Sequence, residues 1–423
     1  MIVLETADGR RQTAEIMLNA KCRFVKIKFK YFKPRTSNFE LCSMNENYVD
    51  TIIIGASAAG LACAVCLKKY QIPFILLEQY DRIGVEWTHR YDRLHLHTPK
   101  KNSALPYFGM PGNYEKYVSK NDFVNYLQQY SDEFNIQPLF NRKVIQVKRN
   151  DNKWETSTTT EKFTSQNLII ATGFSRKPLQ PEVKGIENFK GEIIHSSQYK
   201  NGKLYAGKKV LVVGFGNSAC EIAIDLHEHN ALPSLSVRSG VNIIPRDIAG
   251  IPIVNIVLAE SWLSKISPAL TDTIDKPILS LIYGNYKKYG LTKLPYGPIT
   301  QITKHKRIPL LDIGTINLIK KGKIKVCPGI DQNTSAGLKF TDGREETFDA
   351  IIFATGYESA VSEFLSGYDE RDSTGKERNG LPNLYFCGFN LSPNGMLREI
   401  GIEARRIAKK LVESRVLMPT SPS

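Results

Sequence analysis

Two short stretches, Gly55-Ala-Ser-Ala-Ala-Gly60 and Gly214-Phe-Gly-Asn-Ser-Ala219, decide how this chain is expected to fold. Each follows an apolar, β-branched run, Val49–Ile54 or Val210–Val213, typical of parallel strands buried on both faces. A glycine turn that leaves such a strand and opens a helix is the fingerprint of a dinucleotide-binding unit, because the N–H groups of the helix N-terminus meet the pyrophosphate. One such motif is weak. Two of them predict an α/β protein with two Rossmann-like dinucleotide-binding domains.

The residue that ends the next strand of each unit indicates which dinucleotide is bound. In the first unit the strand Phe74–Leu77 ends in Glu78, followed by Gln79. A carboxylate there accepts both hydroxyls of an adenosine ribose and repels a 2′-phosphate, which fits FAD or NAD. In the second unit the corresponding residue is Arg238, followed by Ser239. An arginine pairs with the 2′-phosphate of NADPH. We therefore assign FAD to the first site and NADPH to the second.

The loops themselves supply the remaining candidate contacts to the two cofactors. One residue departs from the usual pattern, because Ser57 replaces the middle glycine that lets backbone approach phosphate. Its side chain is expected either to hydrogen-bond the phosphate or to displace it slightly. The predicted FAD contacts in the first loop are Gly55, Ser57, Ala58, Ala59 and Gly60, and the predicted NADPH contacts in the second are Gly214, Gly216, Asn217, Ser218 and Ala219.

Two similar segments indicate where the chain crosses between the domains. Leu168-Ile-Ile-Ala-Thr-Gly173 and Ile351-Ile-Phe-Ala-Thr-Gly356 are both apolar strands that end in Ala-Thr-Gly. A later helix, beginning at Leu397, is expected to point its N-terminus at the flavin. We predict a discontinuous FAD domain with an inserted NADPH domain, a disordered extension with Met44 as the functional start, and a C-terminal tail. The expected bounds are 48–203 and 322–412 for FAD, 204–321 for NADPH, 1–47 for the extension and 413–423 for the tail.

Composition limits the class of protein. The 423 residues contain no run of 18 apolar residues, so no membrane span is expected. The net charge of +15 is spread along the chain without a nucleic-acid-binding module, so we expect a basic surface that attracts anionic nucleotides and no nucleic-acid partner. Seven irregularly spaced cysteines fit a reducing compartment and a cytoplasmic protein. No metal site is expected, and a homodimer is one assembly that the sequence leaves open.

Two segments have alternative interpretations. Cys63-Ala-Val-Cys66 has the spacing of a redox dithiol, but it falls among small apolar residues of the helix that starts at Gly60. We favour packing and keep a flavin disulfide oxidoreductase as a rival function, with a nucleotide sensor as a further one. The apolar stretch Ile248–Leu258 is interpreted as buried or substrate-facing rather than membrane-bound.

A third signature, Phe189-Lys-Gly-Glu-Ile-Ile-His-Ser-Ser-Gln-Tyr199, connects the chain with a known family. Together with the two fingerprints it resembles the class B flavin-dependent monooxygenases, in particular the flavin-containing monooxygenase branch. Arg90-Tyr-Asp-Arg-Leu-His-Leu-His97, Leu310-Leu-Asp-Ile-Gly314 and Ile324-Lys-Val-Cys-Pro-Gly329 are similar to the plant YUCCA enzymes and their bacterial relatives. Ser392-Pro-Asn-Gly-Met-Leu-Arg-Glu-Ile-Gly401 departs from the plant pattern, which bears on the substrate.

The resemblance implies an FAD- and NADPH-dependent monooxygenase that takes O2 and a small-molecule substrate. Oxygen would add to the reduced flavin at C4a, and the peroxide would decarboxylate indole-3-pyruvate oxidatively to indole-3-acetate; hydroxylation of nitrogen or sulfur is the alternative. Because the flavin carries the chemistry, no side chain is certain to be catalytic. His195 and Asn102 are the candidates, and His195 is expected to position rather than react. Further residues expected near the flavin are Trp87, Arg90, Asp92, Leu94 and Leu397.

Overall fold

The structure is a computed structural model that describes residues 2–5, 11–18, 25–28, 48–260, 267–368 and 381–417. The chain divides into two compact units, Met1–Glu46 and Asn47–Ser423. In the first unit the described residues form three antiparallel strands in the order β1-β2-β3. Their bounds are Ile2–Glu5 for β1, Arg11–Leu18 for β2 and Val25–Lys28 for β3.

These strands differ from the disordered extension that we expected over residues 1–47. The alternation of apolar and polar residues in Arg11–Leu18 has the period of two that a strand requires, and it is too short to stand out in a basic segment. Met44 lies outside the described residues, so its assignment as the start stays a prediction. At the other end, helix α11 (Met396–Leu417) continues beyond the predicted tail boundary at 413.

The first sheet of the second unit carries the first fingerprint. Its strands run in the order β5-β4-β8-β7-β6, and β23 pairs with β8. Strands β5, β4, β8 and β23 are parallel, whereas β7 and β6 form an antiparallel extension. The bounds are Tyr48–Ile54 (β4), Phe74–Leu77 (β5), Val144–Asn150 (β6), Lys153–Thr158 (β7), Lys162–Ile170 (β8) and Leu384–Phe386 (β23).

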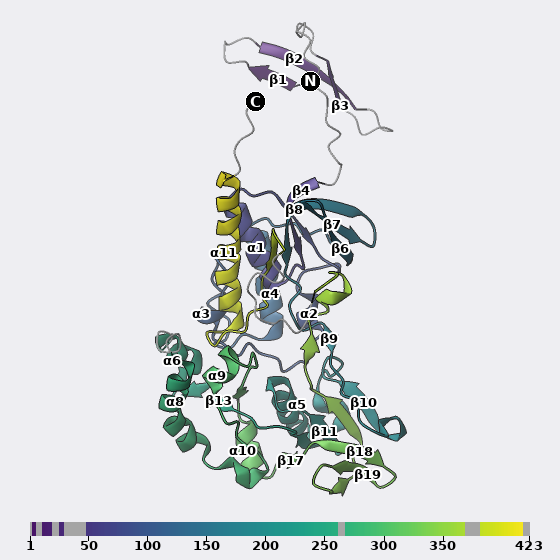
Figure 1. The fold of residues 1–423 in the computed structure, drawn as a ribbon, viewed down its shortest axis with the longest axis vertical. Coiled ribbons are helices and arrows are strands. Elements are labelled where there is room, and N and C mark those ends of the chain that lie inside the picture. The colour runs from purple at the N-terminus through teal and green to yellow at the C-terminus, as the bar shows by residue number, and fades with distance from the viewer. Residues whose placement is uncertain are drawn as a thin grey trace. The chain divides into compact units, whose positions relative to one another are not determined.

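Helices pack on this sheet because its central strands are apolar on both faces. Ile52 and Ile53 of β4 are fully buried on opposite faces. Helix α1 (Ala58–Lys69) lies on one face, where its small residues allow close contact, and α11 packs beside it (Figure 1). Helix α4 (Lys120–Glu133) adds Phe123, Tyr126 and Tyr130 to the same core. The short helices α2 (Val85–Thr88) and α3 (Lys100–Ser103) lie in the connection between β5 and α4.

The second sheet carries the second fingerprint and is entirely parallel, in the order β10-β21-β11-β12-β17. Its bounds are Glu192–His195 (β10), Lys209–Val213 (β11), Leu232–Ser236 (β12), Lys325–Cys327 (β17) and Ala350–Phe353 (β21). Helix α5 (Asn217–Glu228) follows β11 as α1 follows β4. This sheet extends beyond the predicted segment 204–321 on both sides, because β10, β17 and β21 lie outside it.

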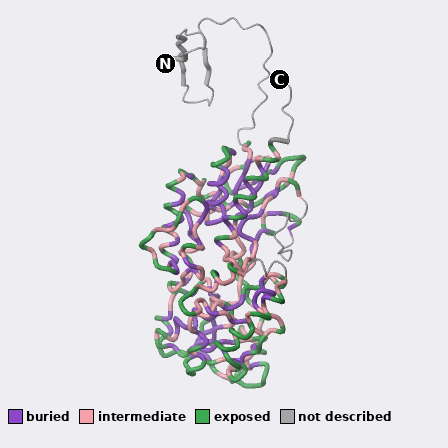
Figure 2. The backbone as a smooth tube through the Cα atoms, turned by 90° about the vertical axis from the view of Figure 1, so that its left-hand side faces the viewer, coloured by how far each residue is buried: buried purple, intermediate pink, exposed green. Residues whose placement is uncertain are grey.

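Smaller elements complete the second unit. Figure 2 shows that buried backbone gathers around both sheets rather than around one. The remaining strands are β9 (Lys177–Pro178), β13 (Ile243–Pro245), β14 (Asp247–Ile248), β15 (Ile251–Pro252), β16 (Leu310–Asp312), β18 (Ile330–Thr334), β19 (Gly337–Phe340), β20 (Glu345–Glu346) and β22 (Tyr357–Glu358). The remaining helices are α6 (Ile253–Ala259), α8 (Pro268–Tyr283), α9 (Pro298–Thr303) and α10 (Thr315–Lys320), with 3-10 turns at Ile186–Asn188, Gly202–Tyr205, Tyr286–Tyr289 and Val361–Glu363. The predicted α/β class with two Rossmann-like sheets is confirmed.

Two residues of the Phe189–Tyr199 signature, Gly191 and Tyr199, have a structural explanation. A Cβ on Gly191 would lie 2.3 Å from the carbonyl oxygen of Asp349, so only glycine lets β10 start beside β21. The Tyr199 hydroxyl donates to Asp225 on α5 at 2.5 Å, and both residues are buried. The signature therefore holds the segment that leads into the second sheet against β21 and α5.

We expect Tyr199→Phe to lower the free energy of unfolding by about 1–3 kcal/mol, because it leaves the buried Asp225 carboxylate without this donor. Urea unfolding of the purified protein measures the change. Tyr48→Phe is the matched control, since Tyr48 is 50% exposed and its substitution should leave stability unchanged. An unaltered urea midpoint for Tyr199→Phe would contradict this holding role.

Candidate functional site

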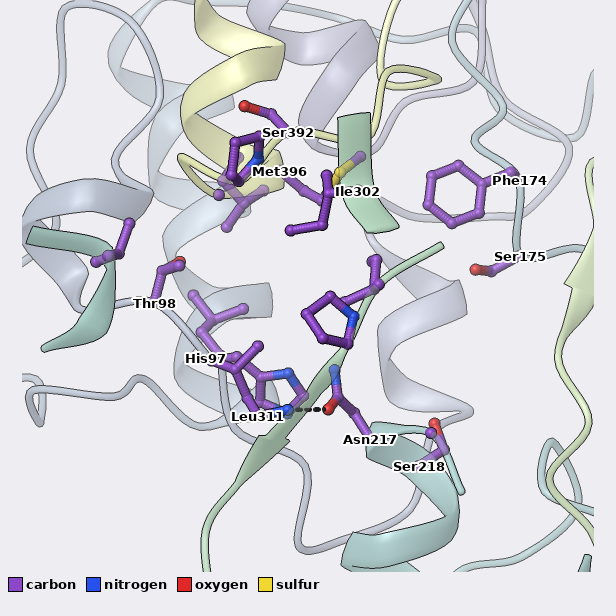
Figure 3. Close-up of a pocket in the computed structure, with 18 of the residues that line it drawn as sticks. His97, Thr98, Phe174, Ser175, Asn217, Ser218, Ile302, Leu311, Ser392 and Met396 are labelled. Atoms are coloured by element: carbon purple, nitrogen blue, oxygen red, sulfur yellow. Dashed lines mark hydrogen bonds between the residues drawn. The ribbon is translucent and has the colours of Figure 1, made fainter. Parts of the chain in front are cut away.

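One cavity of about 820 Å³ is lined by both glycine-rich loops. Ser57, Ala58 and Ala59 reach it from the first loop. Gly216, Asn217 and Ser218 reach it from the second, and Figure 3 shows Asn217 and Ser218 at the start of a helix beside His97. The two predicted dinucleotide loops thus open into a common space.

The first loop is a tight turn that only glycine permits at its two ends. Gly55 has a φ of +102°, and a Cβ on Gly60 would lie 1.8 Å from the carbonyl oxygen of Gly55. The turn brings the first N–H groups of α1 to the cavity, and the first turn of that helix carries no acidic residue. An anionic group is therefore favoured at this point.

The Ser57 hydroxyl is hydrogen-bonded by Trp87, a residue that we expected near the flavin from the sequence. The indole Nε1 of Trp87 donates to the Ser57 hydroxyl at 3.3 Å, and Trp87 packs edge-on against Phe123 with ring centroids 4.6 Å apart. Both Trp87 and Ser57 line the cavity. The hydroxyl that replaces the middle glycine is thereby oriented by Trp87, and it keeps its own proton for another acceptor.

Glu78 sits directly beneath the loop. The Glu78 carboxylate accepts from the backbone N–H of Ala56 at 2.7 Å and from that of Tyr80 at 3.0 Å. Burial raises the pKa of Glu78, and these backbone hydrogen bonds oppose that rise. A second cavity of about 230 Å³ is lined by Gly55, Glu78 and Gln79, and by Arg142 and Lys143 at its far side. That the ribose of FAD meets Glu78 here stays a prediction.

The first site fits an anionic dinucleotide such as FAD. Thr172, which follows β8, lines both cavities, and its buried hydroxyl has no hydrogen-bond partner. Gln79 beside it is oriented by Arg176, which donates to the Gln79 side-chain oxygen at 2.9 Å. The Thr172 hydroxyl and the free N–H groups at the start of α1 can donate to phosphate oxygens. The buried Glu78 carboxylate, which follows the end of β5, can accept from ribose hydroxyls.

Several other predicted flavin contacts also line the large cavity. Arg90 donates to the carbonyl of Ser175 at 2.9 Å and lies 4.5 Å from the centre of the Tyr357 ring. Leu94 and Leu397 are apolar lining residues, and Leu397 belongs to the first turn of α11. This part of the cavity wall is therefore formed by the segment after α2, the start of β22 at Tyr357 and the first turn of α11.

Asp92 and Asn102, both expected near the flavin, line neither the large nor the second cavity. Asn102 lies on α3. Asp92 is directed elsewhere: it accepts from Asn201 at 2.8 Å and pairs with Lys120 at 3.0 Å, and these contacts lower its pKa. Asp92 thus ties the segment 90–97 to α4 and to the chain after Tyr199 instead of facing a ligand.

His195 ends β10 and is buried beside the large cavity, which it does not line. Its Nε2 lies 3.2 Å from the carbonyl oxygen of Gly356, while Nδ1 accepts from the Ser197 N–H at 3.1 Å. Burial lowers the pKa of His195, so the neutral ring is favoured at neutral pH. The ring also packs edge-on against Tyr357, 4.9 Å between centroids. These contacts position the Ala-Thr-Gly356 turn, in line with the positioning role expected for His195.

The second loop repeats the tight turn of the first, but its middle residue is glycine, Gly216, instead of serine. Gly214 has a φ of +129°, and a Cβ there would lie 2.6 Å from the carbonyl oxygen of Ala354. A Cβ on Gly216 would meet nothing within 4 Å, so the backbone at this position faces open space. Asn217 accepts from the backbone N–H of Leu311 at 2.8 Å, and Ala219 is fully buried (Figure 3). The open approach at Gly216 is what a pyrophosphate needs.

Arg238 and Ser239 lie just beyond the end of β12 and are exposed. Gly214 donates from its N–H to the carbonyl of Ser236 at 3.0 Å, which places this strand end beside the loop. Arg238 has no hydrogen bond or ion pair to another described residue. A Cβ built on Gly329 would lie 3.3 Å from the Cγ of Arg238, so glycine at position 329 leaves room for the arginine side chain. The guanidinium is therefore available to a ligand next to the second loop.

The aliphatic wall of the cavity was only partly foreseen. Residues of the stretch 248–258 line it, as the substrate-facing interpretation required. Helices α8 and α9 also contribute, and Figure 3 shows Ile302 of α9 pointing inward. No sequence motif marks these helices, so their place in the cavity wall was not predictable. The additional apolar lining residues are Ile278, Leu279, Ile299, Ile302, Ile308 and Pro309.

The cysteine pair on α1 does not have the surroundings of a redox dithiol. Cys63 and Cys66 are 1% and 0% exposed, and neither lines the large cavity. Burial raises the pKa of Cys66 to about 12, which suppresses the reactive thiolate. Among the described residues no cluster of His, Cys, Asp and Glu could hold a metal ion. None of the helices in the described ranges is long and apolar enough to cross a membrane.

Comparison with known proteins gives concordant matches. The family described as flavin-binding monooxygenase-like matches residues 50–368. The probable indole-3-pyruvate monooxygenase YUCCA4 of Arabidopsis thaliana is 38% identical over 357 residues, 83% of each chain. The indole-3-pyruvate monooxygenase YUCCA8 of Oryza sativa subsp. indica is 38% identical over 84% of this chain and 89% of its own. A flavin-containing monooxygenase from Stenotrophomonas maltophilia has a similar fold, with a TM-score of 0.66, 19% identity, and coverage of 87% of this chain and 99% of its own.

We expect Gly60→Ala to weaken FAD binding at least about tenfold, because the added Cβ forces the first loop apart at the point of phosphate approach. The ratio of flavin to protein absorbance after purification reports the loss. Gly216→Ala is the matched control, since its Cβ meets no protein atom, and it should retain flavin. Full flavin content in Gly60→Ala would show that FAD does not depend on this turn.

Proposed function

The chain belongs to the flavin-binding monooxygenase-like family, and from that premise we propose that it oxidatively decarboxylates indole-3-pyruvate to indole-3-acetate with NADPH and O2. The observation that carries the proposal is the single cavity onto which both dinucleotide loops open. A nicotinamide can reach a flavin only where the two sites share a space. The substrate identity rests on relatives that carry this activity in their names.

The overall reaction fixes what the protein must bring together. Indole-3-pyruvate, O2, NADPH and one proton give indole-3-acetate, CO2, NADP⁺ and water, so one oxygen atom enters the product and the other leaves as water. The bound flavin, once reduced, supplies the activation of O2. The chain itself must bind, orient and keep the site dry.

The first site is proposed to hold FAD through residues already placed around its cavities. The α1 N-terminus and Ser57 would meet the pyrophosphate, and Glu78 would accept the ribose hydroxyls. Arg90 and Trp87 line the large cavity on the flavin side, and neither needs to exchange a proton. Their role is to fix the cofactor against the wall formed by α11.

The second site is proposed to hold NADPH. Gly216 gives open approach for the pyrophosphate, Asn217 and Ser218 face the common cavity, and exposed Arg238 stands beside the loop. A guanidinium that has no ion pair with a described residue is suited to a 2′-phosphate.

The aliphatic wall between α6, α8 and α9 is proposed to exclude water from the substrate end. Nearly all its lining side chains are isoleucine, leucine, valine or proline. Water that reaches a reduced flavin in contact with O2 diverts electrons to H2O2, so a dry wall favours product formation. A homodimer and a cytoplasmic location remain predictions of the sequence.

The direct test is substrate-dependent NADPH oxidation by the FAD-loaded protein. We expect indole-3-pyruvate to accelerate NADPH consumption and to yield indole-3-acetate and CO2 in equal amounts, measured by absorbance at the nicotinamide band and by mass spectrometry. A soft amine and a thioether, assayed in parallel, test the nitrogen- or sulfur-hydroxylating alternative. Oxidation of either of these with no turnover of indole-3-pyruvate would refute the decarboxylation.

We expect Arg238→Ala to reduce the preference for NADPH over NADH about ten- to a hundredfold, since it removes a charge-assisted hydrogen bond to the 2′-phosphate. The ratio of kcat/KM for the two cofactors measures the preference. Lys209→Ala is the control, because Lys209 is exposed at the amino end of the same sheet. If the ratio is the same in Arg238→Ala and in the unmodified enzyme, the assignment of Arg238 is wrong.

A further inference from the structure

The charged residues that line the large cavity are divided between its two sides. Arg90, His95, His97 and Arg176 come from the segments around the flavin loop and the strand β9. Glu260, which follows α6, and Asp275 of α8 are the carboxylates on the aliphatic side. Figure 1 shows α6, α8 and α9 gathered on one side of the second sheet. Glu86 of α2 is a further carboxylate among the lining residues. The charged side chains on the α6–α8 side are thus both acidic, whereas those on the cofactor side are two arginines, two histidines and Glu86.

No hydrogen bond or ion pair joins the side chain of Asp275, or that of Glu260, to another described residue. Of the two, Asp275 lies within a long helix, α8, and Glu260 follows the end of α6. Asp275 is partly buried, and its acidic neighbours are Glu260 and Asp272. Asp272 is committed elsewhere, since it accepts from the N–H groups of Ile299 and Thr300 at 2.8 and 3.0 Å and so caps α9. Burial first, then Glu260 and Asp272, raise the pKa of Asp275 to about 6. Above that pH, Asp275 is a carboxylate on an aliphatic wall with no hydrogen-bond partner in the described part of the chain.

We propose that Asp275 is a specificity-determining residue that accepts a hydrogen bond from the aromatic N–H of the substrate. The inference rests on the proposed function and adds to it the recognition of the ring. The aliphatic wall accommodates a flat apolar ring, and Asp275 offers that ring one acceptor.

The charge division also fixes which way the substrate enters. A 2-oxo acid carries its negative charge at one end, and Glu260 and Asp275 repel that end from the α6–α8 side. Arg90 and Arg176 line the cavity from the segments around the flavin loop, where the one lining carboxylate, Glu86, accepts a hydrogen bond from the Tyr80 hydroxyl at 2.7 Å. The carboxylate end is therefore directed toward the cofactor loops, where it must lie to be lost as CO2, and the N–H end toward Asp275.

The test compares two substrates that differ in the N–H group. Wild-type holoenzyme and Asp275→Ala are assayed with indole-3-pyruvate and with phenylpyruvate, which has an aromatic ring and no N–H. We expect kcat/KM for indole-3-pyruvate to fall about tenfold in the variant, the size of one hydrogen bond to a partly exposed charge. The value for phenylpyruvate should stay within about twofold. Lys276→Ala, an exposed neighbour on α8, is the matched control and should leave both values unchanged.

A binding measurement separates this inference from the proposed function. Flavin absorbance changes report the affinity of the oxidised holoenzyme, with NADP⁺ present, for indole-3-acetate and phenylacetate, and no turnover is needed. If neither oxo acid is oxidised, the proposed function fails, but an indole preference that Asp275→Ala abolishes still upholds the role of Asp275. An equal loss for both rings, or an unchanged indole preference in the variant, would overturn the assignment.

Discussion

The arrangement of this protein depends on a contact that occurs twice, between a fingerprint glycine and the carbonyl of an Ala-Thr-Gly turn. A Cβ on Gly55 would lie 2.9 Å from the carbonyl oxygen of Ala171, and one on Gly214 would lie 2.6 Å from that of Ala354. Each turn is thus wedged between its own strand and the neighbouring parallel strand, β8 or β21. The backbone approach fixes where each following helix begins, so the N–H groups of α1 and α5 emerge at the carboxyl ends of their sheets.

The two turns would remain independent if the chain did not couple the sheets. His195 supplies one link, because its ring holds the carbonyl of Gly356 and packs on Tyr357. Arg90 supplies another, since it donates to the carbonyl of Ser175, which follows β8, and lies over the ring of Tyr357, which follows β21. These residues come from both sheets and from the segment after α2. These contacts give the Phe189–Tyr199 signature a structural role. It positions the Ala-Thr-Gly segments where the chain crosses between the two sheets, and it needs no catalytic group for that role.

Local features of the chain were predictable because they obey short-range rules. The turns at Gly55 and Gly214, the acid at Glu78 and the base at Arg238 all depend on a strand, a turn and a helix that are adjacent in sequence. The membership of β10, β17 and β21 in the second sheet was not predictable, because it depends on pairing between distant strands. The position of Asn102 outside the cavity lining was not predictable for a similar reason, because the short helix α3 is placed by contacts with elements distant in sequence. The aliphatic wall of α8 and α9 carries no motif at all, and only the tertiary structure brings it to the cavity.

The charge of the chain acquires a different meaning once the cavity is known. A net charge of +15 suggests a surface that attracts any anion, including an anionic substrate. Within the site, however, the arginines and histidines stand near the cofactor loops with one carboxylate, Glu86, and only carboxylates stand at the aliphatic side. On the proposed cofactor assignment, phosphates would be met by helix N-termini and by Arg238, so the interior would not need a uniform positive charge. If Asp275 accepts the substrate N–H as proposed, the apolar wall would discriminate by shape and by a single hydrogen-bond donor, whereas the basic surface would act only on the rate at which anions arrive.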